Sequence, residues 1–347
     1  MTTGRGDGAG RHDLVLAVDG GGVKTDLALV ERGGAVRSLV RGGRGQTHYL
    51  GIEGSVEMLE SLLQRGLTEA GLDRTKRPFA STAQIMMAGA DLPEEVLALH
   101  AGIERQNWAD TLVVDSDMPA LLRAGTDRGW GIAVVCGAGI NCIGRAPSGS
   151  GSGPREVRFL SFGPVSGDWG GGLDVGLAAL AAAVRAADGR GPRTLLEEAV
   201  PVHFGLSDPF AVARAVHMEE TPVAKLLELA PLVLAARDED AVAAGIVQRL
   251  ADEVVAFARA ALRRLELTAA DPDVVLGGGL MRAVAADVVE VIARGVHAVA
   301  PAARVVVSPS EPIVGAVLLG LDALGAEASA GARARAELDA AAAAQSV

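Results

Sequence analysis

A short pattern occurs twice in this chain, and the duplication strongly limits the folds available to it. In residues 14–30, an apolar strand is followed by a turn containing Gly20, Gly21 and Gly22, and then by a second apolar strand. Residues 131–145 repeat the arrangement, with Gly137 and Gly139 in the turn. Each copy predicts a β-hairpin, because glycines accommodate the tight reversal between two strands. The duplication predicts two similar domains, each presenting one such turn.

Segments with strand and helix patterns alternate along the rest of the chain. Short apolar runs predict strands at residues 84–87, 111–114, 274–276 and 304–307. Helical patterns cover residues 54–70, 119–125, 170–187, 241–267, 281–299 and 312–324, and a further helix begins at about Pro93. This alternation is typical of an α/β fold.

Chain length favours two domains, because 347 residues exceed what one hydrophobic core usually supports. We place a first domain at residues 13–118 and a second at residues 119–325. The polar, glycine-rich residues 1–12 are predicted to be disordered, and the alanine-rich residues 326–347 form either a surface helix or a disordered tail. Two similar domains that each present a glycine turn suit a ligand held in a cleft between them.

Charge and cysteine content exclude several classes of function. The net charge of −11 offers no basic patch for a nucleic-acid backbone, so we expect no nucleic-acid partner. Two cysteines, Cys136 and Cys142, are too few for a disulfide framework, which favours a reducing cytoplasm. The first residues lack the apolar stretch of a signal peptide, and no apolar run approaches the ~18 residues of a membrane span. We therefore expect a cytoplasmic protein without a membrane partner.

The first glycine turn has the composition of an anion-binding loop. Its three glycines let the backbone approach a ligand closely, and their N–H groups can form a concave anion site. Lys24 and Thr25 follow within reach of a bound phosphate, and Asp19 at the strand end is placed to hold Mg²⁺ through water. The alternative is a plain hairpin turn, which three glycines would also make.

Two further glycine-rich segments have related features. The second hairpin turn, Gly137–Gly139 with Ala138 at its centre, has the same character as the first, and two such hairpins in one chain rarely arise by chance. Gly277, Gly278 and Gly279 follow a buried strand and precede a helix. Such a turn is a common floor for a nucleotide base and ribose, although many strand-to-helix turns contain glycine for structural reasons alone.

These three segments, in this order, resemble the phosphate-1, phosphate-2 and adenosine motifs of the actin-like ATPase and sugar kinase superfamily. The resemblance covers roughly residues 13–320. It implies two ribonuclease H-like domains with ATP and Mg²⁺ in the cleft between them. By this resemblance, residues 20–25, including Val23, and residues 137–139 contact the phosphates, residues 277–279 contact adenosine, and Asp19 holds the metal.

Residues 163–194 carry a narrower resemblance, to the N-acetylglucosamine kinases. A Gly-Asp-Trp-Gly turn at 167–170 is followed by a helical pattern and by an Asp-Gly-Arg-Gly-Pro-Arg-Thr stretch at 188–194. Asn141 and Cys142 also match this branch, which overlaps in sequence with the BadF/BadG/BcrA/BcrD ATPases. The resemblance implies a homodimeric, ATP-dependent kinase that phosphorylates the 6-hydroxyl of an amino sugar, with N-acetylglucosamine the first choice.

The same resemblance assigns the catalytic base to Asp117, which follows a predicted strand. Phosphoryl transfer from ATP needs a carboxylate that orients the sugar hydroxyl and takes its proton. Asp115 competes for this role. The structural alternative for Asp117 is an N-cap of the helix that follows.

Sugar-binding residues are also implied by the resemblance. Asp168 matches a ligand of the sugar hydroxyls, with a helix cap as its structural alternative. Thr47 and His48 match a sugar-contacting segment of the first domain, and Ile140 and Asn141 match the sugar side of the second turn.

Several positions depart from the family pattern. Val23, Ala138 and Ile140 stand where the family has hydroxyl-bearing residues, Thr47 replaces an Asn, and Trp169 replaces a Glu. Backbone N–H groups can still bind phosphates, so we expect ATP binding to persist. The changes on the sugar side leave open N-acetylglucosamine, glucosamine, N-acetylmuramic acid, N-acetylmannosamine and glucose.

Two other functions compete with the kinase. One is an ATPase activator of a dehydratase or reductase, in which cysteines from two subunits bind a [4Fe–4S] cluster. Cys136 and Cys142 flank the second turn within predicted strands, which argues against that role. The other is a non-catalytic sugar sensor, which the lost hydroxyls favour and the retained Asp19, Asp117 and Asp168 oppose.

Overall fold

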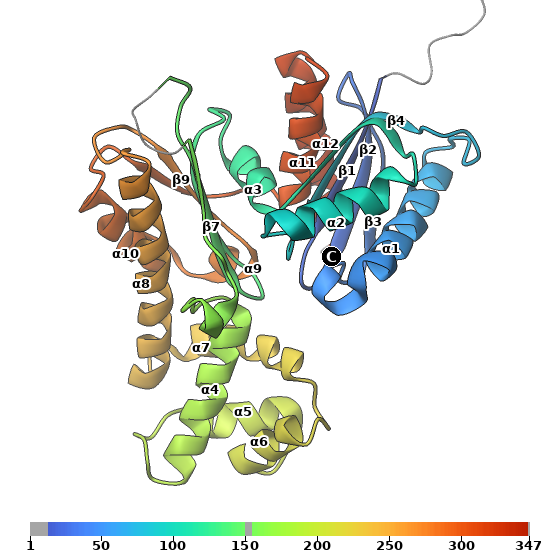
Figure 1. The fold of residues 1–347 in the computed structure, drawn as a ribbon. Coiled ribbons are helices and arrows are strands. Elements are labelled where there is room, and N and C mark those ends of the chain that lie inside the picture. Colours follow the sequence, from blue (N-terminus) through green and yellow to red (C-terminus); the bar gives the residue numbers. More distant parts are fainter. Residues whose placement is uncertain (1–12, 150–154, 346–347) are drawn as a thin grey trace, which may run out of the picture. The chain divides into compact units, whose positions relative to one another are not determined.

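The computed structural model describes residues 13–149 and 155–345. The predicted disorder of residues 1–12 therefore lies outside the described residues. The chain forms two compact units (Figure 1). Unit 1 ends at Gly129 and resumes at Ser308, and unit 2 comprises Trp130–Val307.

Unit 1 is built on a mixed five-stranded sheet of order β3-β2-β1-β4-β5. Its strands are β1 (Leu14–Gly20), β2 (Thr25–Glu31), β3 (Val36–Gly42), β4 (Ala80–Met87) and β5 (Ala109–Asp115). β1, β2 and β3 pair antiparallel, whereas β1, β4 and β5 pair parallel. The carboxyl ends of β1, β4 and β5 therefore meet at one edge of the sheet.

Helices cover both faces of this sheet, and the alternation of side chains in β1 explains why. Leu16 and Val18 join a core with α1 and α2, whereas Val15 and Ala17 join a second core with α11 and α12. All four side chains are buried, because successive residues of a strand point to opposite faces. The helices of unit 1 are α1 (Thr47–Glu69), α2 (Pro93–Glu104), α3 (Met118–Gly125), α11 (Pro312–Ala323) and α12 (Ala328–Gln345).

Unit 2 has a sheet of the same topology, with order β10-β9-β6-β7-β8. Its strands are β6 (Gly131–Cys136), β7 (Ile140–Arg145), β8 (Glu156–Arg158), β9 (Asp273–Gly277) and β10 (Arg304–Val307). β6, β7 and β8 pair antiparallel, and β6, β9 and β10 pair parallel, as do their counterparts in unit 1. The predicted α/β fold with two similar domains is confirmed.

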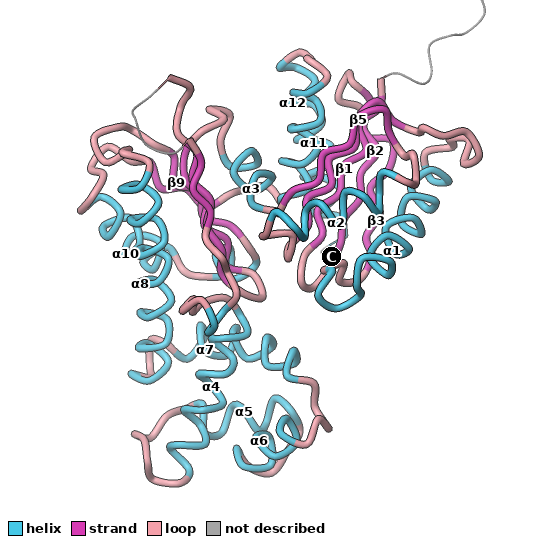
Figure 2. Tube along the Cα trace, viewed as in Figure 1, coloured by secondary structure: helices cyan, strands magenta, loops and turns pink. Residues whose placement is uncertain are grey.

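A group of helices separates β8 from β9 in unit 2 (Figure 2). The first is α4 (Gly172–Ala187) and the last is α8 (Ala241–Arg264), which packs on the sheet through a shared apolar core. Asp240 caps α8 by accepting from the N–H of Val242 at 2.8 Å, and it also accepts from the N–H of Leu195 at 2.8 Å. The remaining elements are α5 (Leu196–Phe204), α6 (Pro209–His217), α7 (Ala230–Ala236), α9 (Gly279–Ala283), α10 (Ala286–His297) and 3₁₀ turns at Gly163–Val165 and Val223–Leu229.

The compact units have different bounds from the predicted domains. The chain returns to unit 1 at Ser308, because α11 is apolar on nearly every side and covers the Val15 face of the first sheet. The alanine-rich tail is the helix α12, which packs on the same face through Ala334 and Leu338. The first strand-turn pattern predicted neither β3 nor the early start of α1, which is kinked at Gly51.

Candidate active site

The first glycine turn closes the β1–β2 hairpin at the carboxyl edge of the unit 1 sheet. Gly20 pairs with Thr25, and the N–H of Gly21 donates to the carbonyl of Lys24 at 2.8 Å. The carbonyl of Gly20 accepts from the N–H of Ala88 at 2.7 Å, just beyond β4. A Cβ at Gly20 would lie 2.2 Å from the sulfur of Met87, so a larger residue there would displace the Met87 side chain.

Two predicted phosphate contacts of this turn differ sharply in exposure. Val23 is 65% exposed at the tip of the turn, so its backbone is accessible to a ligand. Thr25 is fully buried, and its hydroxyl faces Gly45 and has no hydrogen-bond partner among the described residues. Thr25 therefore packs the base of the turn in this conformation and cannot touch a phosphate without a rearrangement.

Asp19, the predicted metal residue, is the last acidic residue of β1 and is 8% exposed. Burial raises the pKa of Asp19 well above its usual value, and the carboxylate of Asp117 raises that pKa further. Asp26 and Glu311 act in the same direction, whereas Lys24 opposes them. The site therefore has excess negative charge, which a cation at Asp19 would relieve.

This environment fits a magnesium ion held mainly through water. In the part of the chain that the structure describes, no three His, Cys, Asp or Glu side chains gather closely enough to hold a metal by themselves. Mg²⁺ commonly keeps several waters and binds proteins through one or two carboxylates. Asp19 supplies one such carboxylate beside a turn that could hold phosphates.

Lys24, another predicted phosphate contact, is engaged with two carboxylates. Its ammonium contacts Glu311, which precedes α11, and lies 2.9 Å from a carboxylate oxygen of Asp26. Arg41 of β3 donates to both oxygens of Asp26, at 2.6 and 3.0 Å, and lies 3.3 Å from Glu311. We call Lys24, Asp26, Arg41 and Glu311 the turn charge cluster.

Asp117, the predicted base, lies between β5 and α3 at the same sheet edge as Asp19. It occupies the N-cap position of α3, yet its side chain accepts no capping hydrogen bond. Burial raises the pKa of Asp117 to about 7, and the nearby Asp91 and Asp115 add to the effect. The carboxylate of Asp115 accepts from the N–H of Ser116 at 2.7 Å. The structural alternative, helix capping by Asp117, is therefore not what its side chain does.

Thr47 and His48 begin α1 and lie against the segment that follows β4. The hydroxyl of Thr47 donates to the carbonyl of Gly89 at 3.4 Å. The ring of His48 lies beside the same glycine and is 2.8 Å from a carboxylate oxygen of Glu95. The other oxygen of Glu95 accepts from the N–H of Asp91 at 3.1 Å. These contacts link the predicted sugar segment to Asp91, whose negative charge helps to raise the pKa of Asp117.

In unit 2, two glycines hold the second turn from either side. Gly171, the N-cap of α4, approaches Gly139 so closely that an added Cβ would lie 2.4 Å from its carbonyl oxygen. Gly278, the N-cap of α9, leaves only 2.2 Å between such a Cβ and the carbonyl oxygen of Cys136. Both glycines have φ near +80 to +90°, a conformation that L side chains rarely adopt.

The start of α4 is hydrogen-bonded to the second turn. The N–H groups of Gly172 and Leu173 donate to the carbonyls of Gly137 and Ala138, at 2.8 and 3.0 Å. The three predicted segments of this unit, the second turn, the 167–170 turn and residues 277–279, therefore meet at one place. Their proximity could not be read from the sequence, where they are far apart.

The predicted sugar residues of unit 2 lie around this junction. Asp168 is half-buried, three residues before the N-cap Gly171, and its carboxylate accepts from the hydroxyl of Ser166. Asn141 is 9% exposed, and its side-chain oxygen accepts from the N–H of Cys142 at 2.7 Å. The Ile140 side chain is buried against Gly170. The helix-cap alternative for Asp168 is excluded, because the N-cap of α4 is Gly171 and, among the described residues, no side chain accepts a capping hydrogen bond there.

Trp169 has a partner that the sequence did not indicate. The guanidinium of Arg249, on α8, lies 4.0 Å from the centre of the indole ring, which is a cation–π contact.

The sequence analysis also did not identify Asp91, Glu311 and Arg41 as residues of the site. Of these, Asp91 could have been found, since it follows β4 at the carboxyl edge of a parallel strand pair, where ligands commonly bind.

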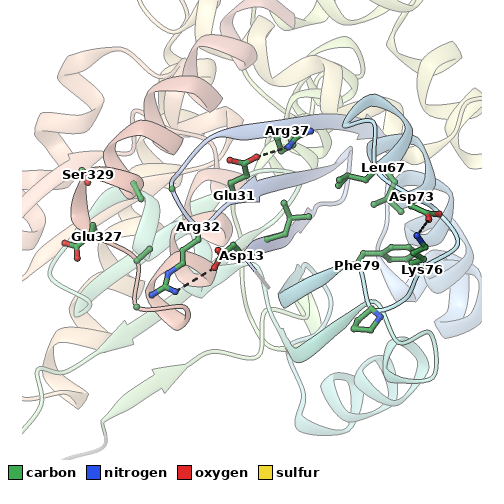
Figure 3. Close-up of a pocket in the computed structure, with 17 residues that line it drawn as sticks. Asp13, Glu31, Arg32, Arg37, Leu67, Asp73, Lys76, Phe79, Glu327 and Ser329 are labelled. Carbon is green, nitrogen blue, oxygen red and sulfur yellow. Dashed lines mark hydrogen bonds and ion pairs between the residues drawn. The ribbon is translucent and has the colours of Figure 1, made fainter. Parts of the chain in front are cut away.

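Figure 3 shows a pocket of unit 1 beside Asp13. Leu14, the first residue of β1, also lines it, so the pocket lies at the opposite end of β1 from Asp19. It measures about 830 Å³ and is lined by Asp13, Arg32, Lys76 and Phe79 among others. Several of its charged groups pair within the pocket, as in Asp13 with Arg32 at 3.8 Å and Lys76 with Asp73 at 3.1 Å. We assign it no part in the candidate active site.

Comparison with known proteins identifies the family. The sequence pattern of the BadF/BadG/BcrA/BcrD ATPase family matches residues 16–320. The chain belongs to this family. In this BadF/BadG/BcrA/BcrD ATPase family member, the matched residues include all three glycine-rich segments. Within residues 13–149 and 155–345, no helix is long and apolar enough to cross a membrane.

Two curated relatives of this family member are named as amino sugar kinases. The N-acetylmuramic acid/N-acetylglucosamine kinase of Clostridium acetobutylicum is 30% identical over 183 residues, or 53% of this chain. That match spans just over half of the relative, 57% of its length. The N-acetyl-D-glucosamine kinase of Dictyostelium discoideum is 21% identical over 89% of this chain and 98% of the relative.

A solved structure supports the fold. A Chromobacterium violaceum protein, named as a candidate N-acetylglucosamine kinase, superposes with a TM-score of 0.71 at 24% identity. The match covers 88% of this chain and 98% of that one. At this identity the likeness establishes the shared two-domain α/β fold.

Proposed function

We propose that this protein is an ATP-dependent kinase that phosphorylates the 6-hydroxyl of an amino sugar, with N-acetylglucosamine as the first candidate. One observation carries the proposal. Asp19, Asp117 and the first glycine turn share one sheet edge in unit 1, and the two carboxylates are close enough that Asp117 raises the pKa of Asp19. A metal site, a base and a phosphate-binding turn are the parts that phosphoryl transfer requires.

Asp117 is the group that takes the proton in this mechanism. Its carboxylate accepts a hydrogen bond from the sugar hydroxyl, aligns the oxygen for attack on the terminal phosphate of ATP, and receives the proton as the O–P bond forms. A pKa near 7 suits this role, because a base works best when its pKa lies near the operating pH. Mg²⁺ at Asp19, when bound, would neutralise charge on the phosphates.

The ligand contacts that the resemblance implies are part of the proposal. Thr47, His48, Asn141 and Asp168 are its sugar contacts, and the glycine turns are its phosphate contacts. Gly277–Gly279 carry the adenosine. The names of the curated relatives support an N-acetylated amino sugar, and the Clostridium acetobutylicum relative adds N-acetylmuramic acid as a second candidate. A homodimer in the cytoplasm is part of the same proposal.

The ATPase-activator function is disfavoured by the cysteines. Cys136 and Cys142 are 0% and 1% exposed in neighbouring strands, and burial raises the pKa of both thiols. Thiols buried inside unit 2 cannot bind a cluster shared between two subunits.

The test is ADP release from ATP–Mg²⁺ by the purified protein against N-acetylglucosamine, N-acetylmuramic acid, glucosamine, N-acetylmannosamine and glucose. We expect turnover with an N-acetylated amino sugar and a sugar 6-phosphate as product by mass and NMR analysis. Asp117→Asn should lose that turnover while binding ATP normally. A wild-type protein that binds ATP but turns over with none of these sugars would sink the proposal.

A further inference from the structure

The turn charge cluster contains a residue to which the proposed function assigns no role. Glu311 immediately precedes α11, where the chain has just returned to unit 1, and contacts the ammonium of Lys24. The sequence separation is 287 residues, so the contact is made by the fold and not by local geometry. Glu311 therefore occupies the position beside Lys24 where the proposed function requires a phosphate.

The backbone around Glu311 is firmly anchored. Ser308 and Ser310 are each 1% exposed, and the hydroxyl of Ser308 donates to the carbonyl of Ser310 at 2.9 Å. The hydroxyl of Ser310 donates to Asp339 of α12 at 3.0 Å and accepts from Arg335 at 3.1 Å. Glu311 is thus presented to the turn from a fixed support.

The turn charge cluster contains two cations and two carboxylates, so its charges balance without a ligand. Lys24 and Glu311 are the pair that can exchange partners. Asp26 is fully buried and is paired both with Lys24, at 2.9 Å, and with Arg41 through two hydrogen bonds, so Asp26 stays paired when Lys24 moves. Lys24 and Glu311 are 31% and 24% exposed, and a lysine ammonium on a flexible stem changes partner more readily than a guanidinium fork. Arg41 lies 3.3 Å from Glu311 and can hold it after Lys24 leaves.

We infer that Glu311 is a phosphate-mimicking positioning residue, which holds Lys24 at the first glycine turn until the phosphates of ATP replace it. The inference rests on the proposed function, because it requires a nucleoside triphosphate at this turn. Binding of ATP moves the Lys24 ammonium from Glu311 to a phosphate oxygen, while Arg41 retains Asp26 and neutralises Glu311. Glu311 therefore competes with ATP for the same cation and lowers the affinity of the turn for it.

The test is calorimetric measurement of ATP affinity in EDTA, so that Mg²⁺ at Asp19 does not contribute. We compare the wild type with Glu311→Gln, Lys24→Met and the double variant. Glu311→Gln should bind ATP roughly two- to fivefold more tightly, the range of a partly exposed ion pair. Lys24→Met should bind more weakly, and adding Glu311→Gln to it should change nothing, because the competition acts through Lys24.

Two controls separate this effect from general changes. Asp322 lies on α11, the helix that Glu311 precedes, and its carboxylate pairs with Arg123 at 2.8 Å. Asp322→Asn removes this carboxylate and should leave ATP affinity unchanged. Adenosine affinity should be equal in the wild type and Glu311→Gln, since adenosine has no phosphate.

Each remaining outcome decides a separate question. If the wild type binds ATP and Glu311→Gln binds it equally or more weakly, the exchange does not occur. The same conclusion follows if Glu311→Gln gains affinity in the Lys24→Met background as well. If the wild type binds no ATP even with Mg²⁺, the proposed kinase function itself fails.

Discussion

Asp117 illustrates how little the position of a residue in a helix reveals about its chemistry. It is the N-cap of α3 by backbone position, where aspartate usually accepts a hydrogen bond from the helix N–H groups. Its carboxylate does not do so, and burial with Asp91 nearby raises its pKa to about 7. A carboxyl group that does not cap its helix and has a pKa near neutrality is suited to proton transfer.

The pH profile of the reaction follows from this pKa. Asp117 accepts a proton only when ionised, so kcat/KM for the sugar should rise with pH and level off above an apparent pKa of about 7. Below that value the rate should fall about tenfold per pH unit. Initial rates between pH 5.5 and 8.5, with a coupled assay checked at each pH, measure the profile.

Matched variants assign the profile to one carboxylate. Asp117→Asn should lower kcat by roughly 10²- to 10⁴-fold, the usual contribution of a general base. Asp115→Asn should keep turnover, with a pH profile of the same shape and a lower midpoint, because the charge of Asp115 contributes to the raised pKa of Asp117. The reverse result would make Asp115 the base.

A second prediction at this scale concerns stability. The folded protein keeps a proton on Asp117 up to about pH 7, whereas an unfolded aspartate loses it near pH 4. A raised carboxyl pKa therefore costs stability as pH rises from about 4 to 7, and the cost is fully present above pH 7. With allowance for partial exposure, Asp117→Asn should stabilise the protein by about 1–4 kcal/mol at pH 8.

Thermal unfolding at two pH values tests this. The Tm of Asp117→Asn should exceed that of the wild type by a few degrees at pH 8 and match it at pH 4, where both carry a neutral side chain. An equal shift at both pH values would mean that the gain comes from packing and not from the charge.

At the scale of elements, the second turn depends on close backbone contacts from α4 and α9. The neighbouring residues Gly278 and Gly279 differ in the space available for a side chain. A Cβ on Gly278 would collide with the carbonyl of Cys136 in a left-handed backbone, whereas a Cβ on Gly279 would meet only open space. The glycine run was predicted as a ligand floor, yet one of its members is also essential for packing.

We expect Gly278→Ala to destabilise unit 2 by at least about 2 kcal/mol, since it adds both strain and a collision. Gly279→Ala should be neutral within about 0.5 kcal/mol, because it begins a helix in open space. Denaturant unfolding of both variants makes the comparison. Equal losses for the two would show that the collision is relieved by a small shift of the backbone.

The sequence predicted most elements that carry strong local signals. The hairpins, the helix over 241–267 and the strand before Gly277 were visible because apolar periodicity and glycines are local features. β3 was missed because buried and exposed side chains alternate only weakly along it. β8 was missed because it has only three residues. Asp19, Asp117 and the glycine turns could be nominated, but the Lys24–Glu311 contact depends on the return of the chain after β10.

At the scale of the whole molecule, each unit has its own hydrophobic core. The core of unit 2 joins β6 and β9 to α4 and α8, whereas β1 of unit 1 is covered on one face by α11 near the end of the chain. The chain order and the spatial order therefore differ, and unit 1 is complete only when residues 308–345 are in place.

This arrangement predicts where a core defect is felt. Leu321→Ala in α11 should cost roughly 2–5 kcal/mol and speed amide exchange in β1 and β2, although α11 follows unit 2 in the chain. Leu250→Ala in α8 should cost as much but act on β6 and β9. Hydrogen exchange with mass spectrometry resolves the strands, and protection lost equally in both sheets would refute independent cores.

The helices between β8 and β9 occupy the place that α1 alone fills between β3 and β4 in unit 1. Both connections follow the third strand of their sheet in chain order, so the two differ in length while the sheet topology is the same. The connection between β8 and β9 can tolerate added residues, because residues added there need not alter either hairpin. A chain of this plan could thus vary the segment between β8 and β9 while both hairpins, and the proposed phosphate-binding turns on them, stay unchanged.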